Sequence, residues 1–341
     1  MRSLLIISLL FAACASYAQQ RPLVTQYNQN NFLLNPALSG QNYGSEFRLG
    51  GRGQYNIAIE NPAESFYLTG NFSFRKREQS ETYGLPIRGK AGEQALKLKK
   101  AVRNRDLSFR SHHGVGFVIL FDRFAGLGST TGQLTYAYHY AINADWQISA
   151  GTGLGVTQYA LNSARLKPEN YNDIMLNGNP SVIQPEISGG VWLSGNNFYM
   201  GVAGQQLAPS GWNFTDKSVK LNNLIYPHIY ATAGYNIAAT DEISIVPSVM
   251  LRSTQSADPS FDLNAIARYQ NNYWIGGSLR FGNSVSIMGG LNILPDLMLG
   301  YSYDQNTSGL TMQSFGTHEI VLGYRLKGYM HKSYDQGKFW N

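Results

Sequence analysis

The sequence predicts an all-β fold: a transmembrane antiparallel β-barrel of about 14 strands, with an N-terminal periplasmic or plug segment. Three observations predict it, namely an export signal, a glycine-rich and aromatic-rich composition with little charge, and period-two alternation of side chains. The chain of 341 residues has 36 Gly, 22 Tyr and 16 Phe, and 14% of its residues are charged, against about 25% in soluble proteins. Because a barrel strand meets lipid at every second position, such a chain needs no long apolar block.

Residues 1–18 have the organisation of a secretory signal peptide. Arg2 gives the positive start, residues 4–13 form the apolar core, and Ser16 and Ala18 are the small residues before a cleavage site. We therefore exclude this segment from the barrel and expect the mature chain to begin at residue 19.

A second interpretation of the same region is a lipoprotein box over residues 11–14, with Cys14 acylated. Phe11 stands where such boxes normally carry Leu, and the site after Ala18 is better formed. Cys14 is the only cysteine of the chain, so cleavage after Ala18 would leave no thiol for disulfides, catalysis or metal binding.

Alternation runs through the predicted barrel, residues 43–327. In residues 146–157, Trp146, Leu154 and their neighbours on the even positions are mainly apolar, whereas the odd positions are small or polar. Residues 261–270 and 317–327 alternate in the same way. A soluble β-sandwich would also alternate, but its strands usually have about 5–6 residues, and many of these segments are about twice as long.

The candidate strands are roughly fourteen, an even number as in bacterial barrels. Their approximate spans are 45–54, 64–75, 113–124, 130–142, 145–159, 184–194, 196–206, 227–238, 242–254, 260–271, 273–282, 284–294, 296–305 and 316–327. Every second connection is short, and the long connections 160–183, 207–226 and 306–315 share one phase. We expect the short connections at the periplasmic rim and the long ones outside the cell.

A basic insert at residues 76–110 breaks this pattern, because it is long but falls in the phase of the short turns. Its charge is close to that of the whole chain, which is +6, so the remainder is nearly neutral. One interpretation is a solvated loop. The other is a docking surface for an acidic periplasmic partner, formed by Lys97, Lys99, Lys100 and Arg103.

Residues 19–42 are rich in Asn and Gln and do not alternate as a barrel strand would. The Asn35-Pro36 step disfavours helix at Asn35. We expect this segment to pack into or under the periplasmic mouth of the barrel. The glycines at 151, 153 and 155 lie on one face of a strand and predict close approach of a plug or a neighbouring backbone.

Signatures of catalysis and of cofactor or metal binding fail. No helix pattern follows the glycines at 151–155, as a phosphate-binding loop would require. His112 and His113 are sequence neighbours, as are His318 and Glu319, so on strands their side chains point to opposite faces. Asp122, Asp304, Arg268 and Arg325 are interpreted as lumen-facing structural ion pairs.

An outer-membrane hydrolase remains a third option, although no Ser–His pair with an orienting group stands out. A nucleic-acid partner is disfavoured, because the basic insert has no interleaved aromatic residues on which bases could stack. We expect no enzyme activity and no cofactor.

Short motifs along the mature chain resemble those of one family. They are Gln26-Tyr27, Leu34-Asn-Pro-Ala-Leu-Ser-Gly40, Arg52-Gly-Gln-Tyr55, Gly114-Val-Gly116 leading to Asp122, Asn197-Phe-Tyr-Met-Gly201, Gly234-Tyr235, Pro247-Ser248, Tyr273-Trp-Ile-Gly276, Gly300-Tyr-Ser-Tyr-Asp304 and Thr317-His-Glu-Ile320 followed by Gly323-Tyr324. The ordered set resembles the PorP/SprF family of Bacteroidetes outer-membrane proteins. Its motif residues include Asn35, Pro36, Gly40, Asp122, Asp304, His318 and Glu319.

The resemblance implies a barrel associated with the type IX secretion system and, in gliding relatives, with motility. It implies a large exported surface protein as partner, with periplasmic secretion or motility components and outer-membrane lipid around the barrel, and no enzyme activity. The chain departs from the family at Tyr55, where many members carry Trp, in the long basic insert, and in an aromatic tail at 328–341. A passive or ligand-specific channel is the alternative, because a barrel of this size can enclose a lumen.

Overall fold

The computed structural model describes residues 24–42, 44–56, 62–74, 109–124, 126–162, 165, 181–209, 212, 226–255, 257–307 and 314–326. The predicted signal peptide, most of the basic insert with Lys97, Lys99, Lys100 and Arg103, and the tail 328–341 lie outside these residues.

The described chain is built from strands and short 3-10 turns. The strands are β1 (Ser45–Asn56), β2 (Ala63–Ser73), β3 (His112–Phe124), β4 (Leu127–Ala141), β5 (Trp146–Leu161), β6 (Ser181–Gly195), β7 (Phe198–Gln205), β8 (His228–Tyr235), β9 (Ile237–Ala238), β10 (Ile243–Thr254), β11 (Ala257–Tyr269), β12 (Tyr273–Arg280), β13 (Ser284–Leu294), β14 (Leu297–Asn306) and β15 (Ser314–Leu326). None of the helices among these residues is long and apolar enough to cross a bilayer.

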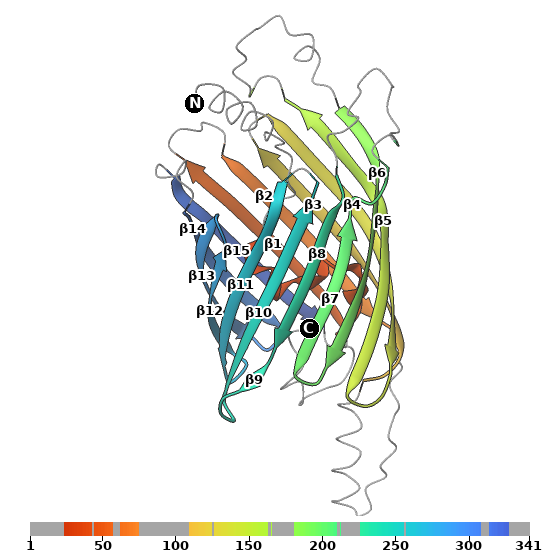
Figure 1. Ribbon diagram of the computed structural model, residues 1–341, viewed down its shortest axis with the longest axis vertical. Helices are drawn as coiled ribbons and strands as arrows, with labels where there is room; N and C mark the ends of the chain where they lie inside the picture. Colours follow the sequence, from red (N-terminus) through yellow and green to blue (C-terminus); the bar gives the residue numbers. More distant parts are fainter. Residues whose placement is uncertain are drawn as a thin grey trace, which may run out of the picture.

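The sheet is antiparallel and closes on itself. Apart from β8 and β9, each strand pairs with its neighbour in the sequence, and β1 pairs with β15 to complete the ring. β8 and β9 both pair with β10 and are two parts of one strand, interrupted at Asn236. Counted in this way, the barrel has fourteen antiparallel strands. This confirms the predicted number of strands and the predicted fold class (Figure 1).

The two rims differ in their connections. We call the end where β1 begins and β15 ends the proximal rim, and the opposite end the distal rim. The long connections β5–β6, β7–β8 and β14–β15 all lie at the distal rim. The proximal rim has tight turns at 142–145, 196–197 and 270–272 and also receives the ends of the basic insert between β2 and β3. The predicted phase of long and short connections is thus confirmed, although the distal rim has short turns as well, for example at 281–283.

Side chains divide between the outer wall and the lumen as the alternation predicts. Leu154 and Ile287 point outward and are 61% and 59% exposed, whereas Asp262 and Glu319 point inward and are almost fully buried. An apolar outer wall around a polar interior is the arrangement that lipid requires of a barrel.

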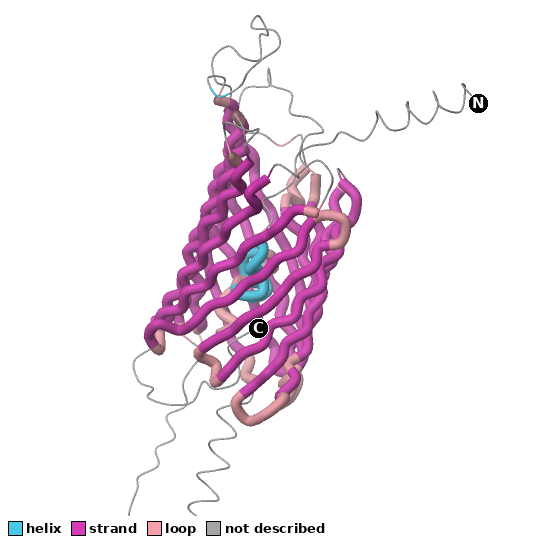
Figure 2. The backbone as a smooth tube through the Cα atoms, turned by 90° about the vertical axis from the view of Figure 1, so that its left-hand side faces the viewer, coloured by secondary structure: helices cyan, strands magenta, loops and turns pink. Residues whose placement is uncertain are grey.

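The lumen contains the N-terminal segment of the same chain. Three 3-10 turns, η1 (Thr25–Gln29), η2 (Asn31–Leu33) and η3 (Pro36–Leu38), lie inside the ring of strands, where Figure 2 shows them in cyan. We call residues 24–42 the plug. The expectation of a segment packed into the barrel is correct, and nearly all of its described residues are buried.

Apolar plug residues form a core with the inner wall. Val24, Phe32, Leu33, Ala37 and Leu38 pack in one cluster. The wall contributes Tyr67, Val118, Leu120, Trp192, Tyr199, Val246 and Val321 to the same cluster. The largest of the hydrophobic clusters among the described residues is therefore a contact between plug and barrel, while Ile266, Trp274 and Met288 form a smaller cluster within the wall.

Candidate functional site: the plugged lumen

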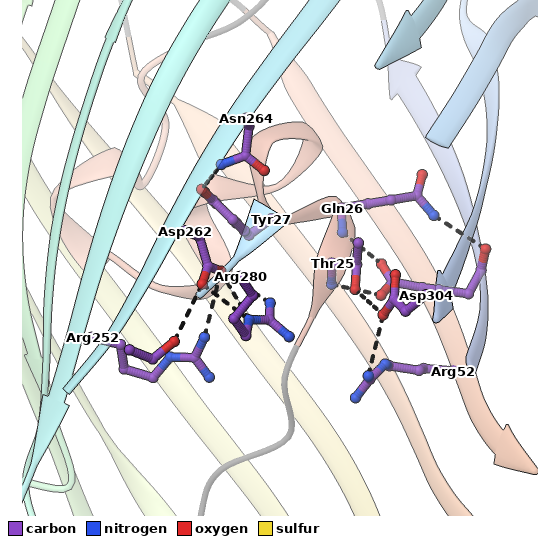
Figure 3. Close-up of polar contacts among 11 residues, drawn as sticks. Thr25, Gln26, Tyr27, Arg52, Arg252, Asp262, Asn264, Arg280 and Asp304 are labelled. Atoms are coloured by element: carbon purple, nitrogen blue, oxygen red, sulfur yellow. Dashed lines mark hydrogen bonds and ion pairs between the residues drawn. The ribbon is translucent and has the colours of Figure 1, made fainter. Parts of the chain in front are cut away.

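The start of the plug is held by carboxylates from β14 and β15. The backbone N–H groups of Thr25 and Gln26 donate to the Glu319 carboxylate, at 2.8 and 3.1 Å. The Thr25 hydroxyl donates to Asp304, whose carboxylate also lies 3.3 Å from Arg52 Nη2 on β1. Because these groups are buried, the charge-assisted hydrogen bonds fix the plug start against one side of the wall (Figure 3).

A second charged cluster lies on the other side of the same turn (Figure 3). Asp262 on β11 accepts from Arg280 Nε and Nη2 on β12, each at 3.0 Å, and lies 3.7 Å from Arg252 Nη2 on β10. Asn264, one step along the inner face of β11, donates to the Tyr27 hydroxyl. Two guanidinium groups thus share one carboxylate beside the plug.

The middle of the plug is held by hydrogen bonds to β2, β6 and β7. Asn30 donates to Thr69 on β2 at 3.1 Å, and Gln205 on β7 donates to the Leu33 carbonyl at 2.8 Å. Asn35 donates from Nδ2 to the Val191 carbonyl on β6 at 3.1 Å while its Oδ1 accepts from Ala37 N–H. This last bond caps η3 and explains why the Asn-Pro step begins a 3-10 turn.

The end of the plug is held by imidazoles. His139 on β4 and His112 on β3 reach the Ser39 and Gly40 carbonyls at 2.8 and 3.0 Å. Gln41 then donates to Ser194 on β6 at 2.8 Å. The plug therefore runs from the level of Asp304, near the distal end of β14, down to the proximal rim, where it continues into β1.

Glycines in the wall make room for the plug backbone. A Cβ added to Gly151 would lie 2.5 Å from the Pro36 carbonyl oxygen, and one added to Gly190 would lie 2.2 Å from Asn35 Oδ1. The predicted close approach of the plug or of a neighbouring backbone is confirmed at Gly151 and Gly155, but not at Gly153. Gly151 faces the plug, whereas Gly153 faces Gln133 and Ser188 side chains and Gly155 faces the backbone of β4.

Residues 16–324 match the model of the family described as type IX secretion system membrane protein PorP/SprF. The chain belongs to the PorP/SprF family. The match spans the plug and almost the whole barrel, and the chain is accordingly an outer-membrane β-barrel protein. No curated protein matches it.

Solved structures with a similar course of the chain are outer-membrane barrels. The toluene transporter TbuX of Ralstonia pickettii has 10% identity and a TM-score of 0.48, covering 91% of this chain and 96% of its own. The monoaromatic hydrocarbon channel CymD has 11% identity and a TM-score of 0.48, covering 90% and 94%. Omp33 of Acinetobacter baumannii has 11% identity and a TM-score of 0.44, covering 84% and 100%.

The motif residues of the PorP/SprF resemblance do not form one site. Asn35, Pro36 and Gly40 belong to the plug, and Asp304 and Glu319 hold its start. His318 instead lies on the outer face, with Nδ1 2.7 Å from the Tyr301 hydroxyl. Asp122 lies near the distal end of β3 and accepts from Ser65 on β2 at 2.6 Å.

The four residues expected in lumen ion pairs lie in different surroundings. Asp304 pairs with Arg52, and Arg268 is buried in the inner wall. Asp122 has a hydroxyl as a close partner, and Arg325 is half-buried at the proximal end of β15. The sequence alone did not indicate the Asp262 cluster or the contacts of His112 and His139 with the plug. These residues occupy the alternate positions that face the lumen, and this was the one feature of the sequence from which they could have been predicted.

A Ser–His pair does exist in the wall. Ser149 Oγ lies 2.7 Å from His139 Nδ1, but both side chains are buried and the other imidazole nitrogen is bonded to the plug. The plug carbonyl occupies the position that an orienting carboxylate would take in a hydrolase. Within the described residues no group of three or more His, Cys, Asp or Glu is placed to hold a metal.

Proposed function

We propose that this protein is a non-enzymatic outer-membrane component of the type IX secretion system that supports the secretion or surface attachment of a large exported partner protein. In this proposal the proximal rim faces the periplasm and the distal rim faces the exterior. The exported partner is bound by rims and loops, not passed through the lumen.

The observation that carries the proposal is the plug, a segment of the protein's own chain that occupies the lumen. The plug is bonded at its start by Glu319 and Asp304 and at its end by His112 and His139. A core of apolar plug residues seals against the wall between these ends. A conduit for free diffusion would leave this space to water, so a plugged member of a secretion-system family is better suited to binding.

The cellular test is deletion of the gene followed by comparison of the proteins on the cell surface and in the medium. We expect one large exported protein to be lost from the surface or misplaced, and to be restored by the intact gene. Unaltered amounts and locations of all large exported proteins would contradict the proposal.

The alternative of a passive or ligand-specific channel is separated by conductance in planar bilayers. The plugged barrel should show small or rare openings, whereas a variant lacking residues 25–39 should open more widely. Large, stable openings of the intact protein would favour the channel instead.

The basic insert is proposed as the docking surface for an acidic periplasmic partner. Replacing Lys97, Lys99, Lys100 and Arg103 by Glu reverses four charges and should weaken recovery of that partner from gently solubilised outer membrane. The matched control reverses four charges in the distal connections, at Arg165, Lys167, Lys217 and Lys220. Equal recovery from both variants would make the insert a solvated loop.

A further inference from the structure

We propose that His112 and His139 form a proton-dependent clamp on the end of the plug, in which His112 is an imidazolium and the grip weakens as the pH rises. The inference concerns regulation of the plug and does not depend on which partner the barrel binds.

The clamp grips two consecutive plug carbonyls. His139 Nε2 lies 2.8 Å from the Ser39 carbonyl oxygen, and His112 Nε2 lies 3.0 Å from that of Gly40. The two rings are stacked, with centroids 4.3 Å apart and planes 12° apart. Both side chains are buried, so bulk water does not compete for these hydrogen bonds.

The proton on His112 follows from what its two nitrogens face. Nε2 faces the Gly40 carbonyl and Nδ1 faces the Arg110 carbonyl, at 3.0 and 2.8 Å. A carbonyl oxygen can only accept a hydrogen bond, so both nitrogens of His112 must donate, and only the imidazolium carries both protons. A neutral ring would turn a nitrogen lone pair toward one of the two oxygens.

For His139, only one ring nitrogen has to donate a hydrogen bond. Its Nε2 faces the Ser39 carbonyl and must donate, but its Nδ1 faces the Ser149 hydroxyl, at 2.7 Å. A hydroxyl can donate or accept, so a neutral His139 satisfies both contacts. Two stacked imidazolium rings would repel each other, and the pair therefore holds one charge.

Among the described residues, the charged groups of the neighbouring strands that have known partners point away from the clamp or pair with each other, and Arg110 itself meets His112 through its backbone carbonyl. His113 points to the opposite face of β3, where its Nδ1 lies 2.7 Å from the Tyr136 hydroxyl. From β1, the inward-facing Glu46 and Arg48 pair with each other. On β5, Gln147 donates to the Arg110 carbonyl at 3.2 Å and brings no charge.

Deprotonation of His112 would weaken the hold on the plug end because one of its two hydrogen bonds, to the Gly40 or the Arg110 carbonyl, would be lost. Gly40 has a φ of +66° and lies against Gly114, whose added Cβ would stand 2.8 Å from the Gly40 Cα. The hydrogen bond from His112 opposes separation at this crowded point. Its loss would leave this end to the contacts of Ser39 with His139 and Thr135 and of Gln41 with Ser194.

The test measures thiol accessibility in the plug. In a Cys14→Ser background, Leu38→Cys introduces one buried thiol beside the clamp. Its reaction rate with a maleimide, divided by the rate in the unfolded chain at the same pH, should rise several-fold between about pH 6.5 and about pH 9, above the usual midpoint of histidine.

Two variants complete the test. His112→Gln should label quickly at every pH in this range, whereas His113→Gln, on the lipid-facing side of the same strand, should keep the slow rate and the rise. A flat profile in the parent, or an unchanged rise in His112→Gln, would overturn the clamp.

A second measurement uses the protein without substitutions in the clamp, so it remains possible if His112→Gln does not fold. Nitrogen-15 spectra of imidazole-labelled intact protein should show one histidine with both ring nitrogens protonated near pH 7.5. Spectra in which all six histidines are neutral at that pH would exclude an imidazolium in the clamp.

Discussion

Gly114 and Ser39 touch so closely that a Cβ on Gly114 would stand 1.8 Å from the Ser39 carbonyl oxygen. Gly114 is on β3, two residues beyond His112 along the inner face, and Ser39 is the last residue before the plug turns toward β1. The plug and wall thus fit to within one methyl group at this point, and this makes their contact testable by small substitutions.

Gly114→Ala should destabilise the plugged barrel by about 1–3 kcal/mol, because the added methyl group must displace the plug or the strand. The measurement is the urea midpoint for unfolding in detergent. The matched control is Gly132→Ala on the neighbouring β4, where an added Cβ meets nothing within 4 Å. Equal midpoints for the two variants would argue against the plug position.

Asp262→Asn should cost about 3–5 kcal/mol, because it removes the one carboxylate shared by Arg280 and Arg252 and leaves two buried guanidinium groups close together. Asp258→Asn, at an exposed position of the same strand, should leave the free energy of unfolding nearly unchanged. A loss at Asp262 no larger than that at Asp258 would mean that the cluster is solvated.

Glu319→Gln should loosen the start of the plug while leaving its end in place. The amide has one acceptor oxygen, and its NH2 group would oppose one of the backbone N–H groups of Thr25 and Gln26. The expected loss is about 1.5–3 kcal/mol, typical of hydrogen bonds to a charged group. Thiol labelling of Val24→Cys should accelerate in this variant, and that of Leu38→Cys should not.

A disulfide should form between Asn35→Cys and Gly190→Cys, because a Cβ at Gly190 would lie 2.9 Å from the Asn35 Cγ. Asn35 lies beside β6, one strand further along the sheet than Gly153 of β5. Asn35→Cys with Gly132→Cys, on the outer face, is the control that should remain reduced. Gel mobility with and without reductant distinguishes the two pairs.

Leu154→Arg should destabilise the barrel in lipid by about 2–4 kcal/mol, because this outward residue lies in the middle of β5. Gln158→Arg, on the same face but closer to the distal rim, should cost about 0–1 kcal/mol. If the two substitutions have the same effect in vesicles, β5 does not cross the hydrocarbon layer at this depth.

The alternation of side chains was enough to predict the barrel, its strand number and the phase of its connections. Each of these depends on local parity, such as Leu154 outward and Gly153 inward, which a sequence displays directly. The presence of a plug could also be predicted, because residues 19–42 fit no strand and glycines cluster on an inner face.

The plug contacts could not be predicted in the same way. The bonds from Thr25 to Asp304 and from His139 to Ser39 join residues that are far apart in the sequence and depend on the registers of several strands. The motif residues likewise share a resemblance but not a face, since His318 and Glu319 point in opposite directions. The odd or even position of a residue in its strand predicts which face of the sheet its side chain lies on. Which residue it contacts across the lumen depends on how the barrel closes.

The unequal lengths of β6 and β7 have a mechanical consequence. β6 has 15 residues and β7 has eight, and their pairing ends at Gly189 and Gly204. Seven additional residues lengthen a strand by about 23 Å. β5 remains paired with β6 as far as Ala160 and Ser181. The β5–β6 hairpin therefore extends beyond β7 at the distal rim (Figure 1). In the orientation proposed above, a pull from outside the cell on that side would be transmitted through a hydrogen-bonded ladder into the wall.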